Sequence, residues 1–272
     1  MTALKPANYE KIRPLLQGMD FHLIGRSILS EKTPATIFVD NTEQPNALFA
    51  QAGHRYILAG DCEIDSFNIG IQKFFTNVIY PREVAAGHEG FALYYDSPAW
   101  ERRVRAILAS KKTIHANREY YACKKLKHKW QDHLPEGFQL KTVDADLLAT
   151  PELVHLDALK EEMTSERPSV EDFLAQSFGV CAIYNNELAG WCLSEYNADG
   201  RCEIGIETTS DYRQRGIGTA LTLALLEHAF SHGITEVGWH CFKRNEVSAK
   251  TALKAGFEKI HDYKSFIVLL KE

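Results

Sequence analysis

The pattern of hydrophobic and polar positions is clearest between residues 203 and 233. Ile204 and Ile206 alternate with charged or small residues as far as Thr208, and this period of two predicts a strand with one buried face. From Ile217 onward the apolar residues recur with the spacing of one helix face, and Gly233 stands where helices commonly end. A strand, a short turn and a long helix are therefore predicted in direct succession.

The alternation of strands and helices continues on both sides of this segment. After it, the pattern predicts a strand over 235–241 and a short helix that Asn245 opens and Gly256 stops. Before it, the pattern predicts a strand over 138–143, helices near 151–162 and 170–177, and a hairpin of strands near 179–184 and 188–196 around Asn185-Asn186. The second half is thus predicted to be α/β, with a mixed sheet flanked by helices.

The first half has weaker patterns of the same kind. They predict strands over Thr36–Val39, Tyr56–Ala59 and Gly90–Tyr95 and a helix over Phe67–Val78. The run His133-Leu134-Pro135-Glu136-Gly137 has the composition of a joint between domains. We therefore expect an N-terminal α/β domain over residues 1–132 and a second domain over residues 138–272.

Composition narrows the class of protein. The 272 residues are 45% hydrophobic and 25% charged, enough for one large core or two smaller ones. No apolar run approaches the roughly 18 residues that a membrane helix needs, and the N-terminus lacks the core of a signal peptide. We therefore expect a cytoplasmic protein without a membrane partner. The six cysteines show no Cys-x-x-Cys spacing and are expected to be buried thiols.

A basic stretch stands out between residues 101 and 130. It holds ten Lys or Arg against two Glu, whereas the whole chain has a formal net charge of -5. With Tyr120, Tyr121 and Trp130 interleaved, it is the best candidate for a nucleic-acid surface. Because the whole chain is acidic, a solvated helix or a network of salt bridges between domains is the favoured interpretation, and a nucleic-acid partner is not expected.

The turn before the long helix carries the candidate chemistry. Arg213, Gly216 and Gly218 form the pattern Arg-x-x-Gly-x-Gly, and Arg215 adds a second positive charge. Glycines without a Cβ allow a bulky anion to approach the free N–H groups of the first helical turn, where the helix dipole is positive. A Rossmann turn would require a third glycine where Leu221 stands, and no Gly-Lys-Ser/Thr sequence of a P-loop occurs. The turn therefore predicts a seat for a diphosphate.

The array of strand, Arg-x-x-Gly-x-Gly, helix, strand, Asn-x-x-Ser, helix and Gly-Phe resembles the GNAT superfamily of acyl-CoA-dependent N-acetyltransferases. Some shorter segments look like the bacterial GNAT group that includes the zwittermicin-resistance acetyltransferases. They are Trp239-His240-Cys241, Glu203-Ile204-Gly205-Ile206 and Gly190-Trp191-Cys192, with looser matches at Phe38-Val39-Asp40 and Tyr56-Ile57-Leu58-Ala59-Gly60. The resemblance is good from about residue 138 to 270 and only suggestive before it. The first half is then either a degenerate GNAT-like repeat that shapes the acceptor pocket or an unrelated cap.

The resemblance implies where acetyl-CoA binds. The pantetheine arm of the cosubstrate would pair with the motif strand, and the diphosphate would lie on the turn. The implied cofactor-binding residues are Ile206, Glu207, Thr208, Arg213, Gln214, Arg215, Gly216, Ile217, Gly218, Thr219, Asn245 and Ser248. For Asn245, a helix N-cap is an equally good interpretation.

The candidate catalytic residues are less well defined. Glu203 and Glu207 lie on one strand face if no bulge intervenes, so either carboxylate could act as general base through a water, and His240 is a third candidate. Many GNAT enzymes have a tyrosine general acid where this chain has Ala252. The acid is then another group, such as Tyr263 or Tyr212, or solvent.

The sequence thus predicts an N-acetyltransferase that moves an acetyl group from acetyl-CoA to a small amine by direct attack in a ternary complex. A non-catalytic acyl-CoA sensor, or a nucleic-acid-associated protein acting through residues 101–130, stays open as an alternative. No metal is expected, since His228 and His232 lack an accompanying zinc motif. The acceptor amine and self-association stay open.

Overall fold

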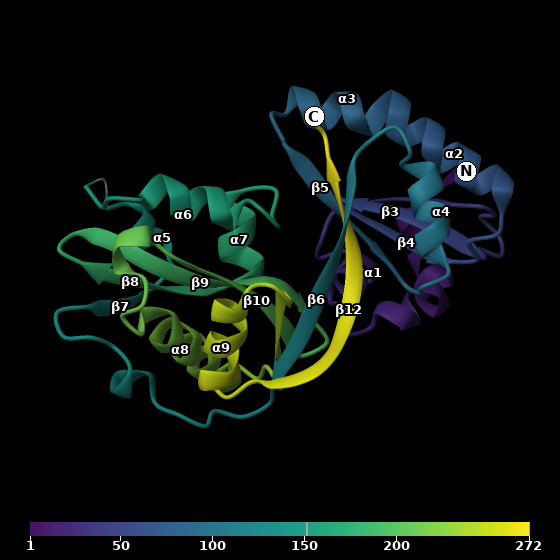
Figure 1. Ribbon diagram of the computed structural model, residues 1–272. Helices are drawn as coiled ribbons and strands as arrows, with labels where there is room; N and C mark the ends of the chain where they lie inside the picture. Colours follow the sequence, from purple (N-terminus) through teal and green to yellow (C-terminus); the bar gives the residue numbers. More distant parts are fainter. Residues whose placement is uncertain (151, 272) are drawn as a thin grey trace. The chain divides into compact units, whose positions relative to one another are not determined.

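The computed structural model describes residues 1–150 and 152–271, so position 151 of the helix predicted near 151–162 lies outside the described residues. The chain divides into two compact units (Figure 1). Unit 1 comprises Met1–Asn117 and Tyr263–Glu272, and unit 2 comprises Arg118–Asp262. The division lies earlier in the chain than the joint expected at 133–137, and the last strand of the chain returns to unit 1.

Unit 2 contains six strands in the order β7-β8-β9-β10-β11-β6. Neighbouring strands are antiparallel except for the parallel pair β10 and β11. The bounds are β7 Gln139–Thr142, β8 Gly179–Tyr184, β9 Glu187–Ala198, β10 Arg201–Thr208, β11 Glu236–Phe242 and β6 Thr113–Cys123, of which Arg118–Cys123 belongs to this unit.

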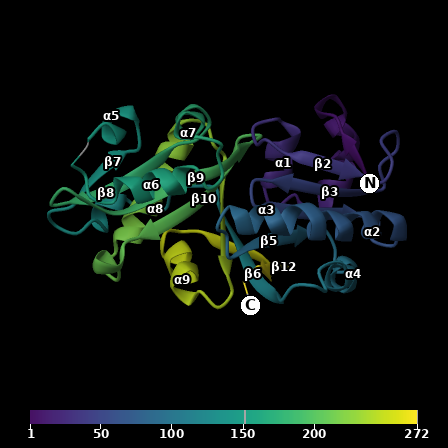
Figure 2. The ribbon, with the colours of Figure 1, turned by 90° about the horizontal axis from the view of Figure 1, so that it is seen from above.

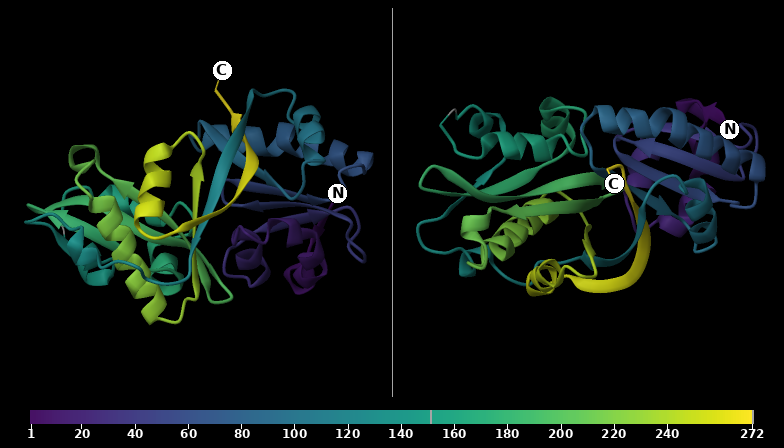
Figure 3. Two further views of the ribbon diagram at one scale, coloured as in Figure 1. Left: turned by 60° about the horizontal axis from the view of Figure 1, so that its bottom comes forward. Right: turned by 45° about the horizontal axis from the view of Figure 1, so that its top comes forward.

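Helices cover both faces of the sheet of unit 2 (Figure 3). The apolar residues of α8 Ile217–Ser231 and α9 Glu246–Lys254 pack on one face, together with Ile204 and Trp239. The other face, at β8 and β9, is covered by α5 Ala145–Leu148, α6 Leu156–Met163 and α7 Val170–Gln176. Alternation along the strands therefore turns the neighbours Glu203 and His240 away from α8 and α9.

Unit 1, whose N-terminal part is purple and blue in Figure 2, has the same sheet order, β1-β2-β3-β4-β5-β12, and again only its fourth and fifth strands are parallel. The bounds are β1 Thr2–Leu4, β2 Thr36–Val39, β3 Ala47–Ala52, β4 Arg55–Gly60, β5 Gly90–Tyr95 and β12 Glu258–Leu269, of which Tyr263–Leu269 belongs to this unit. The helices are η1 Pro6–Met19, α1 Ile24–Leu29, α2 Asp65–Phe74, η2 Phe75–Ile79, α3 Tyr80–Ala85 and α4 Trp100–Ile107. Its core is aromatic, with Tyr56 and Phe75 packed around Phe91.

The two halves of the chain repeat one sequence of elements and exchange their last strands. Each half runs from a first strand through helices, three antiparallel strands, a helix, a parallel strand and a helix to a final strand. The final strand of the first half, β6, pairs with β11 in unit 2, and the final strand of the second half, β12, pairs with β5 in unit 1. The first half is therefore a repeat of the second, not an unrelated cap.

Most predicted elements are confirmed. The strand predicted over Gly90–Tyr95 coincides with β5, and the helix predicted from Ile217 coincides with α8. The basic stretch is divided between two elements, because α4 ends at Ile107 and Thr113–Cys123 forms strand β6. All six cysteines are buried and free, as expected. Among the described residues, no helix is long and apolar enough to cross a membrane.

Candidate functional site

The strand β10 has an open edge where it leaves its parallel neighbour. The pairing of β10 with β11 ends at Ile204 and Trp239, although β10 continues to Thr208 and β11 continues to Phe242. On its other side β10 stays paired with β9 as far as Thr208 opposite Gly190. The two parallel strands therefore separate at a vertex beside Ile204 and Trp239.

The backbone groups that face this open edge follow from the ladder with β9. Thr209 donates its N–H to the carbonyl of Ala189 at 3.0 Å. In an antiparallel ladder the direction of the backbone groups alternates, so the N–H and C=O of Ile206 and Thr208 point away from β9, and those of Glu207 point toward it. The carbonyl of Thr208 indeed accepts a hydrogen bond from Arg213 on that side. Ile206 thus offers a donor and an acceptor at the open edge.

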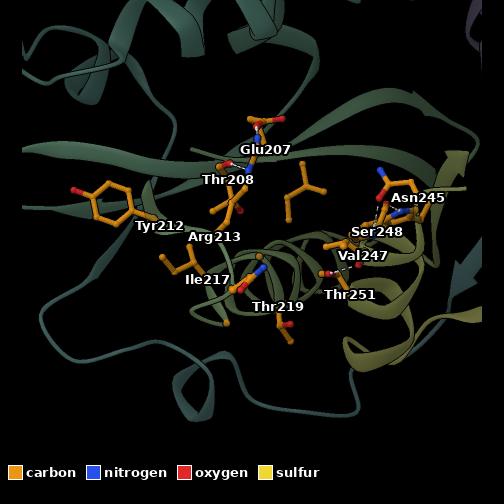
Figure 4. A pocket seen from close by; sticks show the side chains of 15 residues that line it. Glu207, Thr208, Tyr212, Arg213, Ile217, Thr219, Asn245, Val247, Ser248 and Thr251 are labelled. Atoms are coloured by element: carbon orange, nitrogen blue, oxygen red, sulfur yellow. Dashed lines mark hydrogen bonds and ion pairs between the residues drawn. The ribbon is translucent and has the colours of Figure 1, made fainter. Parts of the chain in front are cut away.

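A pocket of about 500 Å³ lies along this edge (Figure 4). In the figure, Glu207, Thr208 and Arg213 lie on one side of it, and Asn245 and Ser248 on the other. Of the twelve residues predicted to bind the cofactor, only Arg215 is outside its lining. The lining residues are Ile206, Glu207, Thr208, Tyr212, Arg213, Gln214, Gly216, Ile217, Gly218, Thr219, Trp239, Asn245, Val247, Ser248 and Thr251.

The turn between β10 and α8 presents backbone N–H groups to the pocket. Gln214 and Gly216 have φ angles of 63° and 86°, and left-handed residues in such a turn form concave N–H nests that bind anions. Helix α8 begins at Ile217 after the N-cap Gly216, and within the described residues no side chain caps its first turn. The positive end of a 15-residue helix is therefore directed at the pocket.

The two arginines of the turn have different surroundings. The Arg213 guanidinium contacts the end of β10, where Nε donates to the carbonyl of Thr208 at 3.0 Å and Nη2 lies 3.0 Å from the Glu207 carboxylate. The Arg215 guanidinium lies over the ring of Tyr212, 5.4 Å from its centroid. Arg213 therefore belongs to the wall of the pocket, whereas Arg215 adds charge beside it.

The far wall of the pocket is the start of α9. Asn245 is the N-cap of this helix, because its Oδ1 accepts a hydrogen bond from the N–H of Ser248 at 3.1 Å. The hydroxyl of Ser248 in turn accepts from the indole N–H of Trp239 at 3.0 Å. These bonds fix the helix start against the strand that forms the vertex.

Glu203 and His240 meet on the sheet face opposite α8 and α9. Glu203 Oε1 lies 3.1 Å from His240 Nε2, and the side chains are only 1% and 8% exposed. Gly238 makes room for this pair, because a Cβ there would stand 3.2 Å from Cγ of Glu203. Neither residue lines the pocket, but each is next to a residue of the vertex pair Ile204 and Trp239.

The third catalytic candidate lies apart from this pair. Glu207 lines the pocket, is about half exposed and is paired with Arg213. Along an extended strand, four residues separate it from Glu203 by about 13 Å. The ladder between β9 and β10 shifts register between Cys202 and Ile204, where β9 advances three residues against two on β10, and it is regular from Ile204 to Thr208. The structure thus joins Glu203 to His240 and places Glu207 at the pocket.

Tyr120 is a neighbour of His240 that the sequence did not identify. Its ring stacks on the imidazole at 4.8 Å, and its hydroxyl accepts a hydrogen bond from Arg201 at 3.2 Å. Burial raises the pKa of this phenol. The residue lies on β6, in the strand that the first half of the chain contributes, so only the strand exchange could have revealed it.

The alternative general acids are also located. Ala252, which stands on α9 at the position where a tyrosine was sought, is fully buried in the core of unit 2. Tyr212 lines the pocket and donates its hydroxyl to Glu187, a hydrogen bond that raises the pKa of the phenol. Tyr263 packs against Phe21 in unit 1.

Comparisons with known proteins agree on one family. The family model described as GNAT acetyltransferase matches residues 13–266. The uncharacterized N-acetyltransferase YdfB of Bacillus subtilis (strain 168) is 25% identical over 241 residues, which cover 87% of each chain.

Solved structures share the fold over nearly the whole chain. A GCN5-related N-acetyltransferase-like protein from Streptococcus suis 89/1591 has a TM-score of 0.73 at 20% identity and covers 96% of this chain and 98% of its own. A GCN5-related N-acetyltransferase from Sphaerobacter thermophilus has a TM-score of 0.62 at 14% identity, with 100% and 95% covered. A tandem GNAT protein from the clavulanic acid biosynthesis pathway has a TM-score of 0.55 at 14% identity, with 100% and 98% covered.

Proposed function

Because the chain belongs to the GNAT acetyltransferase family, whose members are acyl-CoA-dependent transferases, we propose that it moves an acetyl group from acetyl-CoA to a small amine. The observation that carries this proposal is the open edge of β10, which ends at a pocket beside an uncapped helix start. The chemistry of these groups fits the two parts of coenzyme A that must be held. A strand edge suits the amide-containing pantetheine arm, and a helix N-terminus suits the diphosphate.

The diphosphate would lie on the N–H groups from Arg213 to Thr219. The pantetheine arm would follow the open edge of β10 toward the vertex, where the N–H of Ile206 can polarise the thioester carbonyl. The thioester would then reach the sheet beside Glu203 and His240.

The transfer itself requires an unprotonated amine. The amine nitrogen attacks the thioester carbonyl carbon, a C–N bond forms, the C–S bond breaks, and the thiolate of coenzyme A leaves with its electron pair. We propose that His240 accepts the proton that the attacking nitrogen loses. Glu203 orients the imidazole of His240 and stabilises the imidazolium that forms. The thiolate takes a proton from water. A cysteine-bound intermediate is disfavoured, because burial raises the pKa of the Cys241 thiol next to the vertex.

A binding and turnover experiment tests this proposal. The unaltered protein is expected to bind acetyl-CoA in calorimetry, to melt at a higher temperature with it, and to release free thiol when a suitable amine is added. Glu203→Gln and His240→Asn should keep acetyl-CoA affinity and lower kcat by about 10²- to 10⁴-fold. If Glu207→Gln lost turnover and the other two kept it, the base would be Glu207.

The resemblance to the zwittermicin-resistance group supports a narrower proposal for the acceptor. We infer an amine of the antibiotic type, small and cationic, and a panel of such amines, polyamines and amino acids would test it by thiol release. A protein that bound acetyl-CoA tightly and released no thiol with any amine would instead be an acyl-CoA sensor. The replacement of the usual tyrosine by the buried Ala252 is the observation that keeps this second function in view.

A further inference from the structure

Arg213 connects the turn of the pocket to the last two residues of β10. One guanidinium makes both contacts, through Nε to the carbonyl of Thr208 and through Nη2 to the carboxylate of Glu207, each at 3.0 Å. A guanidinium has five N–H donors in a rigid planar fork. With the side chain 62% exposed at the pocket, the remaining donors can meet a phosphate oxygen.

The contact to Thr208 closes one position of the open edge. The carbonyls of Thr208 and Ile206 face the same edge, and that of Thr208 already accepts from Arg213. A ligand that pairs with this edge as an added strand therefore finds its first available backbone partners at Ile206. The strand edge is limited by Arg213 on one side and by the vertex at Ile204 on the other.

We propose that Arg213 is a positioning residue that sets how far the pantetheine arm reaches along β10. This inference rests on the proposed function, because it concerns the same seat for acetyl-CoA. The Arg213 guanidinium would bind the diphosphate at the same place where it closes the edge of β10. One rigid group then determines where the pantetheine arm begins and which residue of β10 the arm pairs with first.

The distances make this register important for turnover. Residues that face one edge of a strand repeat about every 7 Å, so an arm paired one step too early would leave its thioester about 7 Å from the intended place. A misplacement of about 1 Å can already cost about 10²-fold in rate. Glu203 and His240, the proposed proton acceptor, are held next to the vertex by their contact with each other. They cannot follow such a shift of the thioester.

A comparison of Arg213 with Arg215 distinguishes an effect on the register of the pantetheine arm from an effect of positive charge alone. Arg213 and Arg215 carry the same charge two residues apart, but Arg215 lies over Tyr212 and does not line the pocket. A lysine at position 213 keeps the charge and loses the planar fork, so it cannot hold Thr208, Glu207 and a phosphate together. Arg244, whose guanidinium lies over Phe242 at 5.4 Å, is an arginine of unit 2 outside the pocket lining.

The test compares Arg213→Lys, Arg215→Gln and Arg244→Gln with the unaltered protein. We measure acetyl-CoA affinity by calorimetry, kcat at saturating acetyl-CoA, and the ratio of turnover with acetyl-CoA to that with propionyl-CoA. Arg213→Lys should bind acetyl-CoA within about threefold of the unaltered protein and lose at least about tenfold in kcat, with a changed acyl ratio. Arg215→Gln should lose mainly affinity, and Arg244→Gln should match the unaltered protein in all three measurements.

Two different failures can be told apart. If Arg213→Lys kept kcat and the acyl ratio, or if Arg213→Lys and Arg215→Gln changed kcat equally, Arg213 would contribute charge only and the positioning role would be overturned. If the unaltered protein failed to bind acetyl-CoA at all, the proposed function would fall and this inference with it.

Discussion

At Gly218 the proposed binding of acetyl-CoA and the stability of the fold make opposite demands on the side chain. A Cβ at this position would stand 3.6 Å from Ile206, Thr208 and Thr251, which is ordinary contact but inside the pocket lining. Since alanine is favoured over glycine in helices by up to about 1 kcal/mol, Gly218→Ala should keep or raise the melting temperature. Its methyl group should weaken acetyl-CoA binding by about tenfold or more, which calorimetry would measure.

Gly216 is the matched comparison for this prediction. Its φ of 86° is left-handed, so an alanine there should cost about 1–2 kcal/mol in folding as well as affinity. Gly216→Ala should therefore lower both the melting temperature and acetyl-CoA affinity. Acetyl-CoA binding by Gly218→Ala as tight as that of the unaltered protein would contradict the placement of the diphosphate on this turn.

A buried carboxylate in unit 1 predicts a pH dependence of stability. Burial alone would raise the pKa of Glu83, but hydrogen bonds from Tyr56, His88 and Arg82 outweigh it and leave the pKa below its usual range. A carboxyl with a lowered folded-state pKa stabilises the fold above its unfolded pKa of about 4.3, and this contribution is lost as pH falls through the folded value. Chemical denaturation between pH 7 and pH 3 should show that loss.

The variant Glu83→Gln isolates this contribution. It keeps the size of the side chain and removes the charge that three donors share, so it should cost about 2 kcal/mol at pH 7. The difference in unfolding free energy between variant and unaltered protein should shrink as pH falls below about 4. A difference that stayed constant across this range would show that the charge of Glu83 has no role in stability.

At the scale of elements, the passage of β12 from unit 2 into unit 1 makes a prediction about which core the chain supports before this strand and along it. Phe257 and Phe266 are nine positions apart in the sequence, yet Phe257 is buried in unit 2 beside Trp239 and Phe266 in unit 1 beside Tyr95. Each change to alanine should cost about 3–5 kcal/mol. In hydrogen exchange, Phe266→Ala should expose amides of β5, and Phe257→Ala should expose those of β11. Equal loss of protection in both strands would contradict the exchange.

The sequence predicted what is local and failed where partners are distant. The strand, turn and helix of the pocket follow one another within a short segment, so periodicity and glycine positions sufficed to locate them. Glu203 and His240 were each candidates, but their contact requires the register of β10 against β11. The strand exchange, and with it the place of Tyr120 beside His240, could not be predicted. Any strand with an apolar face can pair with either β5 or β11, and only the pairing across the whole chain determines which of them it joins.

At the scale of the whole molecule, the two repeats differ in whether the strand edge next to the parallel pair is open. In unit 1 the pairing of β4 with β5 ends at Leu58, and Asp96 then fills the edge that is open in unit 2. Its N–H bonds the carbonyl of Leu58 at 3.1 Å, and its carboxylate accepts from the N–H of Gly60 at 2.9 Å. After β4 the chain carries Asp61, Glu63 and Asp65 where the second half has its arginines. Asp96 therefore occupies in unit 1 the edge that is open in unit 2, and the turn after β4 is acidic, with Glu63 and Asp65 paired to Arg103.

This asymmetry predicts one acetyl-CoA per chain. Calorimetry should give a stoichiometry near one, and bound acetyl-CoA should slow hydrogen exchange over residues 204–219 and 245–251 and leave residues 57–67 unchanged. Asp96→Ala should keep the stoichiometry near one, because removing the carboxylate frees an edge but leaves the negative charges that follow β4. A stoichiometry near two in the unaltered protein, or protection of residues 57–67 there, would mean that both repeats bind the cosubstrate although Asp96 closes the edge in unit 1.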